Sequence, residues 1–253
     1  MFILQISAPS GNIQLYFQTH NFGLFAGISY NDRLSVNYFE IESSSKREWM
    51  QQIAIFGGTF DPVHCGHLIV AETALNQVPL EKIIWVPSAH PPHKKAASFQ
   101  HRLAMLQAAT TDNSGFAVSP IEQLQFGTSY AINTLIDLSN FYPNTHWYWI
   151  VGLDTFQTLP QWYRGQELAQ LCDWLIAPRY LGSECITQTD LMCKQVEQKL
   201  ASQSVTIHWQ LLHTPLVGVS SSMIRNLCRD RQSIRYLVPE SVRSYIADHN
   251  LYA

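Results

Sequence analysis

The chain of 253 residues carries 16 Lys and Arg residues against 19 Asp and Glu residues, a formal net charge of -3, and 46% of its residues are hydrophobic. This balance gives no general electrostatic attraction to nucleic acid or to anionic lipid. No apolar run approaches the roughly 18 residues that a membrane-spanning helix needs, and the apolar N-terminus lacks the basic flank of a secretory signal. We therefore expect a cytoplasmic protein that binds neither nucleic acid nor membranes, built as one large domain or as one domain with an appendage.

The first 49 residues differ from the rest, because they mix Gly, Asn, Ser and aromatic residues and alternate only weakly in "IQLYFQ" and "RLSVNYFEI". Two or three short strands and a loose tail are both consistent with this pattern. A polar linker, "SSSKREWM", then ends at Met50, and the first convincing core strand begins at Ile53. We expect an N-terminal extension over residues 1–49, either an appendage or a mis-assigned upstream start, and a compact domain over residues 50–253.

From Met50 onward, strand-like apolar runs alternate with amphipathic stretches of helical length. We expect strands at residues 53–56, 82–87, 116–118, 146–151, 173–177 and 205–212. We expect helices at residues 67–77, 99–110, 129–141, 163–170, 191–202, 221–229 and 240–249. This order predicts an α/β fold with a doubly wound, mostly parallel sheet of the Rossmann-like kind, which binds ligands at the carboxyl ends of its strands.

The segment "GGTFDPVHCGHL", residues 57–68, stands at the carboxyl end of the first of these strands. Gly57 and Gly58 allow a sharp turn and a close approach of a ligand to main-chain N–H groups. A helix that begins near His64 places His64 and His67 on one face of its first turn, where the N–H groups and the helix dipole favour anions. A satisfied core or surface histidine and a metal site are the alternatives, but no nearby Cys or acidic cluster supplies further metal ligands. We therefore expect a polyphosphate site.

The five cysteines form no CxxC pair. An odd count without a signal peptide argues against a disulfide framework and against a structural zinc site. We expect reduced thiols and no metal bound by the protein's own side chains.

A second segment, "VSSSMIR", runs from Val219 to Arg225. Its three hydroxyls and the N–H groups at a helix start can bind phosphate oxygens, and the Arg225 guanidinium adds a charge-assisted fork. A serine run alone is usually a helix cap. Beside the histidine segment, it favours a site for the β- and γ-phosphates.

The two segments together resemble the signatures of the (H/T)xGH nucleotidyltransferase superfamily, whose members transfer a nucleotidyl group from ATP or CTP to a phosphate-bearing acceptor. The resemblance implies that His64, His67 and Arg225 are catalytic, and that Mg²⁺ arrives on the ATP phosphates. It also implies an ATP-binding set of Gly57, Gly58, Thr59, Phe60, His64, His67, Asp154, Ser221, Ser222 and Arg225.

Further segments narrow the resemblance, namely "PPHKK" from Pro91, "SYAINTL" from Ser129, "WIVGLDTFQTLPQWYR" from Trp149 and "YLVPESVRSYIADHNLY" from Tyr236. With them the chain resembles bacterial nicotinate-nucleotide adenylyltransferases, in register over residues 53–252. The resemblance implies that ATP and nicotinate mononucleotide give deamido-NAD and pyrophosphate, a step of NAD biosynthesis. The resemblance also implies that the indole of Trp162 stacks on the pyridine ring of the acceptor. The full set of acceptor-binding residues that it implies is His93, Lys94, Tyr130, Ala131, Trp162 and Tyr163.

One residue departs from the family pattern, since Ala131 stands where a threonine usually helps to hold the pyridine carboxylate. A preference for nicotinamide mononucleotide therefore remains an alternative. Pantetheine-phosphate adenylyltransferase is a close rival, but that enzyme is usually shorter and lacks the LPxWY and PPHK segments. A non-catalytic nucleotide-binding relative is an alternative from another class. The sequence leaves the oligomeric state open, with a homo-oligomer as one outcome.

Overall fold

The computed structural model describes residues 51–91, 96–125, 127–178, 183–215 and 217–253, together with four strands among the first 50 residues. Contacts within the chain divide it into two compact units, Met1–Trp49 and Met50–Ala253. In the described part of the chain, no helix is both long and apolar enough to cross a membrane.

The first unit contains an antiparallel sheet in the order β1-β2-β3-β4. Its strands are β1 (Gln5–Ser7), β2 (Gln14–Gln18), β3 (Phe25–Asn31) and β4 (Arg33–Phe39). The weakly alternating runs of the sequence correspond to β2 and β4. The four strands exceed the predicted two or three, because β1 is three residues long and β3 contains a glycine and two small residues that mask its alternation.

The second unit is built on a parallel sheet of six strands in the order β10-β9-β8-β5-β6-β7. The strands are β5 (Gln51–Gly58), β6 (Lys82–Pro87), β7 (Phe116–Val118), β8 (Thr145–Gly152), β9 (Asp173–Ala177) and β10 (Trp209–Leu211). Strands β6 and β7 follow β5 in the sequence and lie on one side of it in the sheet. Strands β8, β9 and β10 come later in the sequence and lie on the other side of β5. The strand order therefore reverses between β5 and β8, which is where such sheets form a ligand crevice at their carboxyl ends.

The last predicted strand is too long, because only its final part pairs with the sheet. Val205 and Ile207 are 6% and 4% exposed, and their alternation gives the sequence a strand pattern. They pack into the hydrophobic core without pairing with a neighbouring strand, and β10 begins only at Trp209.

The helices surround the sheet, and most lie within two residues of their predicted limits. They are α1 (Cys65–Gln77), α2 (Phe99–Thr110), α3 (Ala131–Phe141), α4 (Leu153–Gln157), α5 (Gly165–Leu171), α6 (Ser183–Ala201), α7 (Ser221–Arg229) and α8 (Glu240–Asp248), with short 3-10 turns η1 (Ile121–Leu124) and η2 (Leu159–Gln161). Helix α6 begins eight residues before its prediction, because its first two turns are mainly polar and carry no apolar stripe. The turns α4, η1 and η2 were missed, since elements this short show no periodicity.

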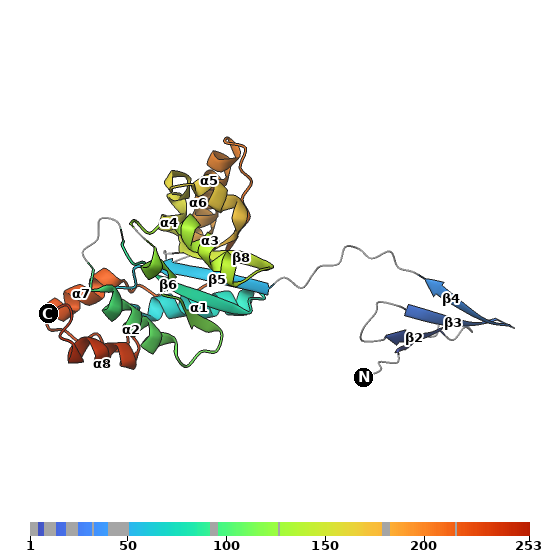
Figure 1. Ribbon diagram of the computed structural model, residues 1–253, viewed down its shortest axis with the longest axis horizontal. Helices are drawn as coiled ribbons and strands as arrows, with labels where there is room; N and C mark the ends of the chain where they lie inside the picture. The colour runs from blue at the N-terminus through green and yellow to red at the C-terminus, as the bar shows by residue number, and fades with distance from the viewer. Residues whose placement is uncertain are drawn as a thin grey trace. The chain divides into compact units, whose positions relative to one another are not determined.

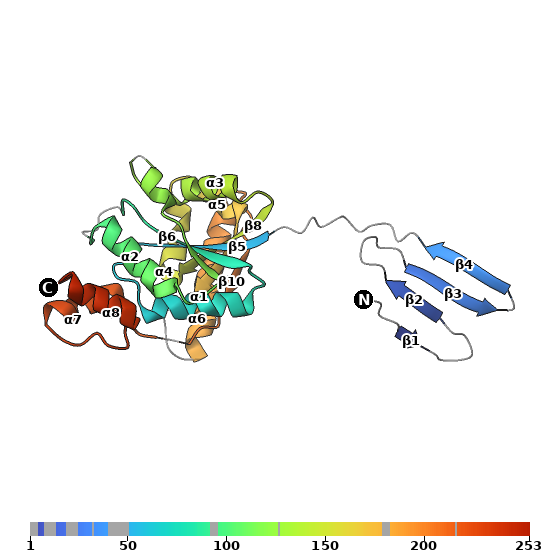
Figure 2. The ribbon, with the colours of Figure 1, turned by 60° about the horizontal axis from the view of Figure 1, so that its bottom comes forward.

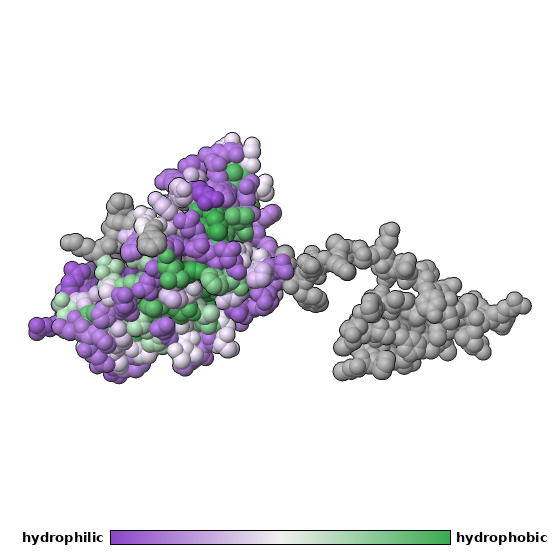
Figure 3. All heavy atoms as spheres, viewed as in Figure 1, coloured by the Kyte–Doolittle hydropathy of each residue, from purple (hydrophilic) through white to green (hydrophobic). Residues whose placement is uncertain are grey.

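Helices cover both faces of the sheet (Figures 1 and 2), and each face has its own hydrophobic core. On β5, Ile53 and Ile55 pack with α3, α4, α5 and α6, whereas Ala54 and Phe56 pack with α1, α2, α7 and α8. All four side chains are at most 7% exposed, as expected for a parallel strand covered on both faces. Hydrophobic residues gather in the middle of the face shown in Figure 3, between predominantly polar surroundings.

The thiols differ in their access to solvent. Cys65, Cys172, Cys193 and Cys228 are all free in the described part of the chain. Cys172 and Cys193 are 5% and 0% exposed, whereas Cys65 and Cys228 are partly exposed. Burial raises the pKa of the Cys193 thiol to about 12, and it also raises the pKa of Cys172 strongly.

We predict that iodoacetamide at pH 8 modifies Cys65 and Cys228 in the native protein and spares Cys172 and Cys193 until the chain unfolds. The thiolate is the reactive form, and the two buried thiols have neither that form nor access to the reagent. Peptide mass spectrometry after timed labelling measures the four rates. Labelling of Cys193 as fast as Cys228 in folded protein would contradict this packing.

Candidate active site

A cleft of about 880 Å³ opens at the carboxyl edge of the parallel sheet. This is large enough for a nucleotide, since ligand pockets commonly measure about 300 to 1,000 Å³. The ends of β5, β8 and β9 contribute Gly58, Gly152 and Ala177 to its wall, on both sides of the point where the strand order reverses. The histidine segment and the serine segment, more than 150 residues apart in the sequence, both line it. The described residues of this cleft are Phe56, Gly57, Gly58, Thr59, Phe60, Asp61, His64, Gly66, His67, Val70, Ala96, Val151, Gly152, Thr155, Ala177, Pro178, Thr214, Pro215, Val217, Gly218, Val219, Ser220, Ser221, Ser222 and Arg225.

The two histidines lie at the start of α1, where His64 is the N-cap and His67 is the third residue of the helix. Their rings stack with centroids 3.6 Å apart, so the predicted common face is confirmed. The main-chain N–H of His64 donates to Nδ1 of His67 over 3.2 Å, in the way that a glutamate side chain reaches back in a capping box. Because Nδ1 accepts this bond, the proton of the neutral His67 ring lies on Nε2, where it can be donated to a ligand.

The aromatic and glycine residues of the turn fix the position of His67. Phe60 has a positive φ of 49° and is only 2% exposed, so it touches the cleft with little of its surface. Its ring meets the His67 ring edge-on, with centroids 5.1 Å apart. A Cβ on Gly58 would lie 3.0 Å from the Phe60 ring, and a Cβ on Gly66 would lie 3.1 Å from the His64 ring. The glycines therefore give these rings room to pack tightly against the backbone.

Helix α7 is bonded directly to the histidine-bearing turn. Ser220 is its N-cap and accepts from the main-chain N–H of Met223 over 3.2 Å. The Ser221 hydroxyl donates to the Pro62 carbonyl over 2.9 Å. Nη2 of Arg225 donates to the Ser222 hydroxyl over 3.1 Å. The hydroxyls therefore serve largely to hold the helix start in place, and a helix start of this kind offers its main-chain N–H groups to an anion.

A buried polar network lies behind the cleft, and the sequence reasoning missed it. Asp61 is 3% exposed, and its Oδ1 accepts from the Ala97 N–H over 3.1 Å and from the Tyr252 hydroxyl over 2.7 Å. Arg225 donates from Nη1 to the Asp61 main-chain carbonyl over 2.7 Å. Arg102 is 1% exposed and donates to the carbonyls of Thr59 and Ala97, over 2.8 and 3.0 Å. The one available signal was an aspartate within an otherwise apolar turn, because a buried charge requires partners.

Comparison with known proteins agrees with this geometry. Residues 55–227 match the cytidylyltransferase-like family. A protein of Trichormus variabilis (strain ATCC 29413 / PCC 7937), named probable nicotinate-nucleotide adenylyltransferase, is 71% identical over 204 residues, which cover 81% of this chain and 98% of that protein. The chain belongs to the nicotinate-nucleotide adenylyltransferase family.

Other relatives support the same family. The Nostoc sp. (strain PCC 7120 / SAG 25.82 / UTEX 2576) protein of the same name is 70% identical over 81% of this chain and 98% of its own length. Among solved structures, Plasmodium falciparum nicotinic acid mononucleotide adenylyltransferase complexed with NaAD superimposes with a TM-score of 0.64. That match covers 80% of this chain and 97% of the other at 20% identity, and it shows the shared fold.

In this adenylyltransferase family member, some residues that the sequence predicts for the site lie outside the lining of the cleft. Asp154 lies in the first turn of α4, between the lining residues Gly152 and Thr155, but does not itself line the cleft. His93 and Lys94 lie outside the described residues. Ala96 is the next described residue along the chain, and it lines the cleft.

The four remaining acceptor-site candidates lie at the start of α3 and just after η2. The rings of Tyr130 and Tyr163 lie 4.4 Å apart, and both side chains are exposed. Ala131 is the first residue of α3. Trp162 is half-buried, donates from Nε1 to the Thr158 hydroxyl over 2.9 Å and packs edge-on against Trp174. The structure thus brings Tyr130 and Tyr163 together, and it places none of the four in the lining of the cleft.

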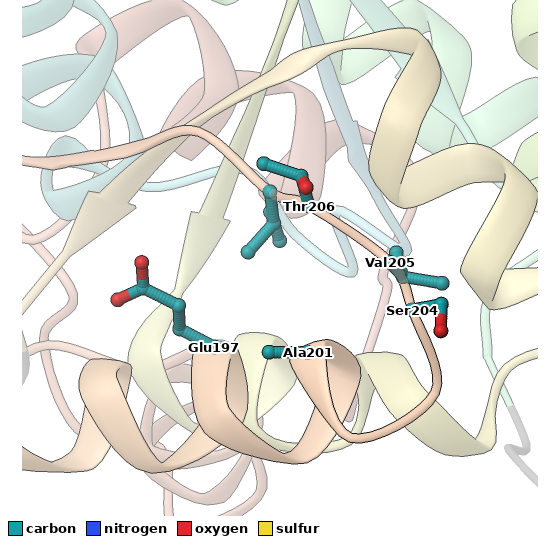
Figure 4. Close-up of a pocket in the computed structure, with 6 residues that line it drawn as sticks. Glu197, Ala201, Ser204, Val205 and Thr206 are labelled. Atoms are coloured by element: carbon teal, nitrogen blue, oxygen red, sulfur yellow. The ribbon is translucent and has the colours of Figure 1, made fainter.

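A second hollow of about 220 Å³ lies where α6 ends, and its lining includes none of these residues (Figure 4). Glu197, Ser204 and Thr206 supply its polar atoms. The Glu197 carboxylate already accepts from Nε1 of Trp209 over 3.1 Å. This hollow has no basic group in its described lining, so the cleft at the sheet edge is the candidate for an anionic ligand.

Proposed function

We propose that this chain transfers the adenylyl group of ATP to nicotinate mononucleotide, giving deamido-NAD and pyrophosphate. The observation that carries the proposal is the 71% identity to a relative of that name over 98% of its length. The joint lining of one cleft by the two signature segments supports it independently. Family membership makes the chain a nucleotidyltransferase of NAD biosynthesis.

In the proposed reaction, a phosphate oxygen of the acceptor attacks the α-phosphorus of ATP in line. A new P–O bond forms there as the bond to the bridging oxygen of pyrophosphate breaks. No side-chain nucleophile is required, because the acceptor phosphate is already an anion. The protein positions two polyanions and stabilises the charge that develops on the transferred group and the leaving group.

We assign the donors on the basis of their positions. His64 and His67 donate to oxygens of the α- and β-phosphates, and the Nε2–H of His67 is oriented for this by the bond at its Nδ1. The start of α7 and the Arg225 guanidinium hold the β- and γ-phosphates that leave as pyrophosphate. Thr59, Gly57 and the other cleft residues bring main-chain groups close to the nucleotide.

The metal in this proposal is Mg²⁺ carried by ATP. Asp61 is the sole carboxylate among the described lining residues, and its Oδ1 already accepts from the Tyr252 hydroxyl and the Ala97 N–H. The described residues also contain no cluster of three or more His, Cys, Asp or Glu side chains that could hold a metal ion. These side chains do not form a metal cage, and Mg²⁺ keeps water ligands readily when it binds with a nucleotide. Its contribution is to neutralise phosphate charge.

For the acceptor, we propose that Trp162 provides the stacking surface for the pyridine ring, with Tyr130, Tyr163 and the Ala131 main chain nearby. We predict that Trp162→Ala raises the KM for the mononucleotide by about tenfold or more and leaves the KM for ATP nearly unchanged, because stacking on an aromatic side chain contributes roughly 1 to 3 kcal/mol. Trp162→Phe, which retains a ring, should recover most of the loss. Equal increases in both KM values would instead indicate general damage to the core around Trp174.

The reaction itself is tested by measuring pyrophosphate release with ATP and either nicotinate or nicotinamide mononucleotide. We expect turnover with the nicotinate form by the full chain and by a chain beginning at Met50, since the cleft is lined by described residues of the second unit alone. A strong preference for the nicotinamide form would overturn the substrate assignment. ATP binding without pyrophosphate release by either protein would support a non-catalytic nucleotide-binding relative.

A further inference from the structure

Tyr252 connects the segment after α8 to the turn that carries the histidines. Its hydroxyl donates to Oδ1 of Asp61 over 2.7 Å, across 191 positions of sequence. Burial raises the pKa of the Tyr252 phenol, and the hydrogen bond to Asp61 raises it further. The phenol therefore keeps its proton and remains a donor to the Asp61 carboxylate.

The same carboxylate faces the Arg225 guanidinium without bonding to it closely. Oδ2 of Asp61 lies 3.7 Å from Nη1 of Arg225, a separation within ion-pair distance but beyond a normal hydrogen bond. Nη1 donates instead to the main-chain carbonyl of Asp61, over 2.7 Å. This arrangement is unusual, because a buried carboxylate beside a guanidinium normally forms close, charge-assisted bonds with it.

The hydrogen bonds at Oδ1 account for the separation. The Tyr252 hydroxyl and the Ala97 N–H both hold this oxygen, and they leave the carboxylate little freedom to turn toward Arg225. The guanidinium then uses two of its five N–H groups on the Asp61 carbonyl and the Ser222 hydroxyl, and the others are available to phosphate oxygens in the cleft. Loss of the phenol would allow Asp61 to form a close ion pair that competes with the phosphates.

We propose that Tyr252 is a positioning residue of the nucleotide site, because it holds the Asp61 carboxylate away from Arg225 and so keeps the guanidinium available to the phosphates of ATP. This inference rests on the proposed function only for the identity of the nucleotide. Tyr252 itself does not line the cleft, so it acts through Asp61.

The test compares Tyr252→Phe with Tyr245→Phe in the full chain. Tyr245 is a matched control, since its hydroxyl also makes one side-chain bond, to Nδ1 of His101 over 3.0 Å, and it lies on α8 away from the cleft lining. Titration calorimetry measures the Kd for ATP with Mg²⁺ and the Kd for AMP, in the absence of any acceptor. We expect Tyr252→Phe to weaken ATP binding about tenfold and AMP binding less than about twofold, because a bond to a charged group contributes roughly 1.5 kcal/mol or more. Tyr245→Phe should change neither Kd.

A second comparison uses Asp61→Asn, because an asparagine cannot form an ion pair with Arg225. The Kd for ATP of the double variant Asp61→Asn, Tyr252→Phe should lie within about twofold of the Kd of Asp61→Asn alone, since the competing charge is absent from both proteins. This comparison also serves if the single phenylalanine variant does not fold. Equal weakening of ATP and AMP, or an undiminished loss in the Asp61→Asn background, would show a purely structural role and overturn the proposal. ATP binding is read without turnover, so a failure of the proposed reaction would be seen separately in the pyrophosphate assay.

Discussion

His67→Ala is expected to reduce turnover roughly a hundred- to a thousandfold while the protein stays folded, because removal of one preorganised donor to a developing oxyanion costs about 3 to 4 kcal/mol. The geometry supports this proposed role for His67. It sits at the anion-binding start of α1, its Nδ1 accepts the His64 N–H, and Phe60 packs edge-on against its ring. Initial rates of pyrophosphate release at saturating substrates measure the loss, and near-ultraviolet circular dichroism checks the fold.

Two further variants separate chemistry from helix capping. His67→Gln keeps an acceptor at the position where a capping box uses Gln or Glu, so it should restore stability lost in His67→Ala without restoring turnover. His249→Ala removes an exposed imidazole that donates to the Tyr245 carbonyl outside the cleft lining, and it should turn over normally. Near-normal turnover by His67→Ala would show that the imidazole has no role in the reaction.

Arg225→Ala is expected to lower kcat/KM for ATP about a hundredfold, because it would remove the proposed charge-assisted contact to the leaving phosphates. Arg225→Lys should recover only part of this activity. A lysine keeps the charge but cannot contact the Asp61 carbonyl, the Ser222 hydroxyl and a phosphate from one planar group. Steady-state kinetics with ATP varied at a fixed mononucleotide concentration measure both effects.

The matched control is Arg229→Ala, on the same helix one turn later. That guanidinium contacts the Asn226 side chain and the Arg225 carbonyl, and it does not line the cleft. Arg229→Ala should lower kcat/KM for ATP by less than about threefold, because solvent and salt largely screen the effect of an exposed charge outside the cleft. If Arg229→Ala were as damaging as Arg225→Ala, net charge rather than a specific phosphate contact would explain the result.

Much of the fold could be predicted because its signals are local. The apolar runs of β6 and β9 and the limits of α2 and α7 follow from the residues within each element, and their predicted bounds match the structure. The errors arose where local pattern and pairing disagree. Val205 and Ile207 alternate like a strand but are buried by packing alone, and the first turns of α6 carry no apolar stripe.

The site was predictable to the extent that it depends on contiguous segments. The turn before α1 and the start of α7 were expected to meet, and both line the same cleft. The residues that join them were not predictable, since Asp61 finds its partners 36, 164 and 191 positions away in Ala97, Arg225 and Tyr252. Only the folded chain shows that Ser221 uses its hydroxyl on Pro62. The roles of His93, Lys94 and Trp162 stay predictions.

In the proposed function, the imidazoles of His64 and His67 and the start of α7 bind the same triphosphate. A crystal structure of the full chain with Mg²⁺ and a non-hydrolysable ATP analogue tests it directly. We expect phosphate oxygens within hydrogen-bond distance of both Nε2 of His67 and the Arg225 guanidinium in a single bound nucleotide. A triphosphate that contacts only one of these two groups, or that lies outside the cleft at the sheet edge, would contradict the account.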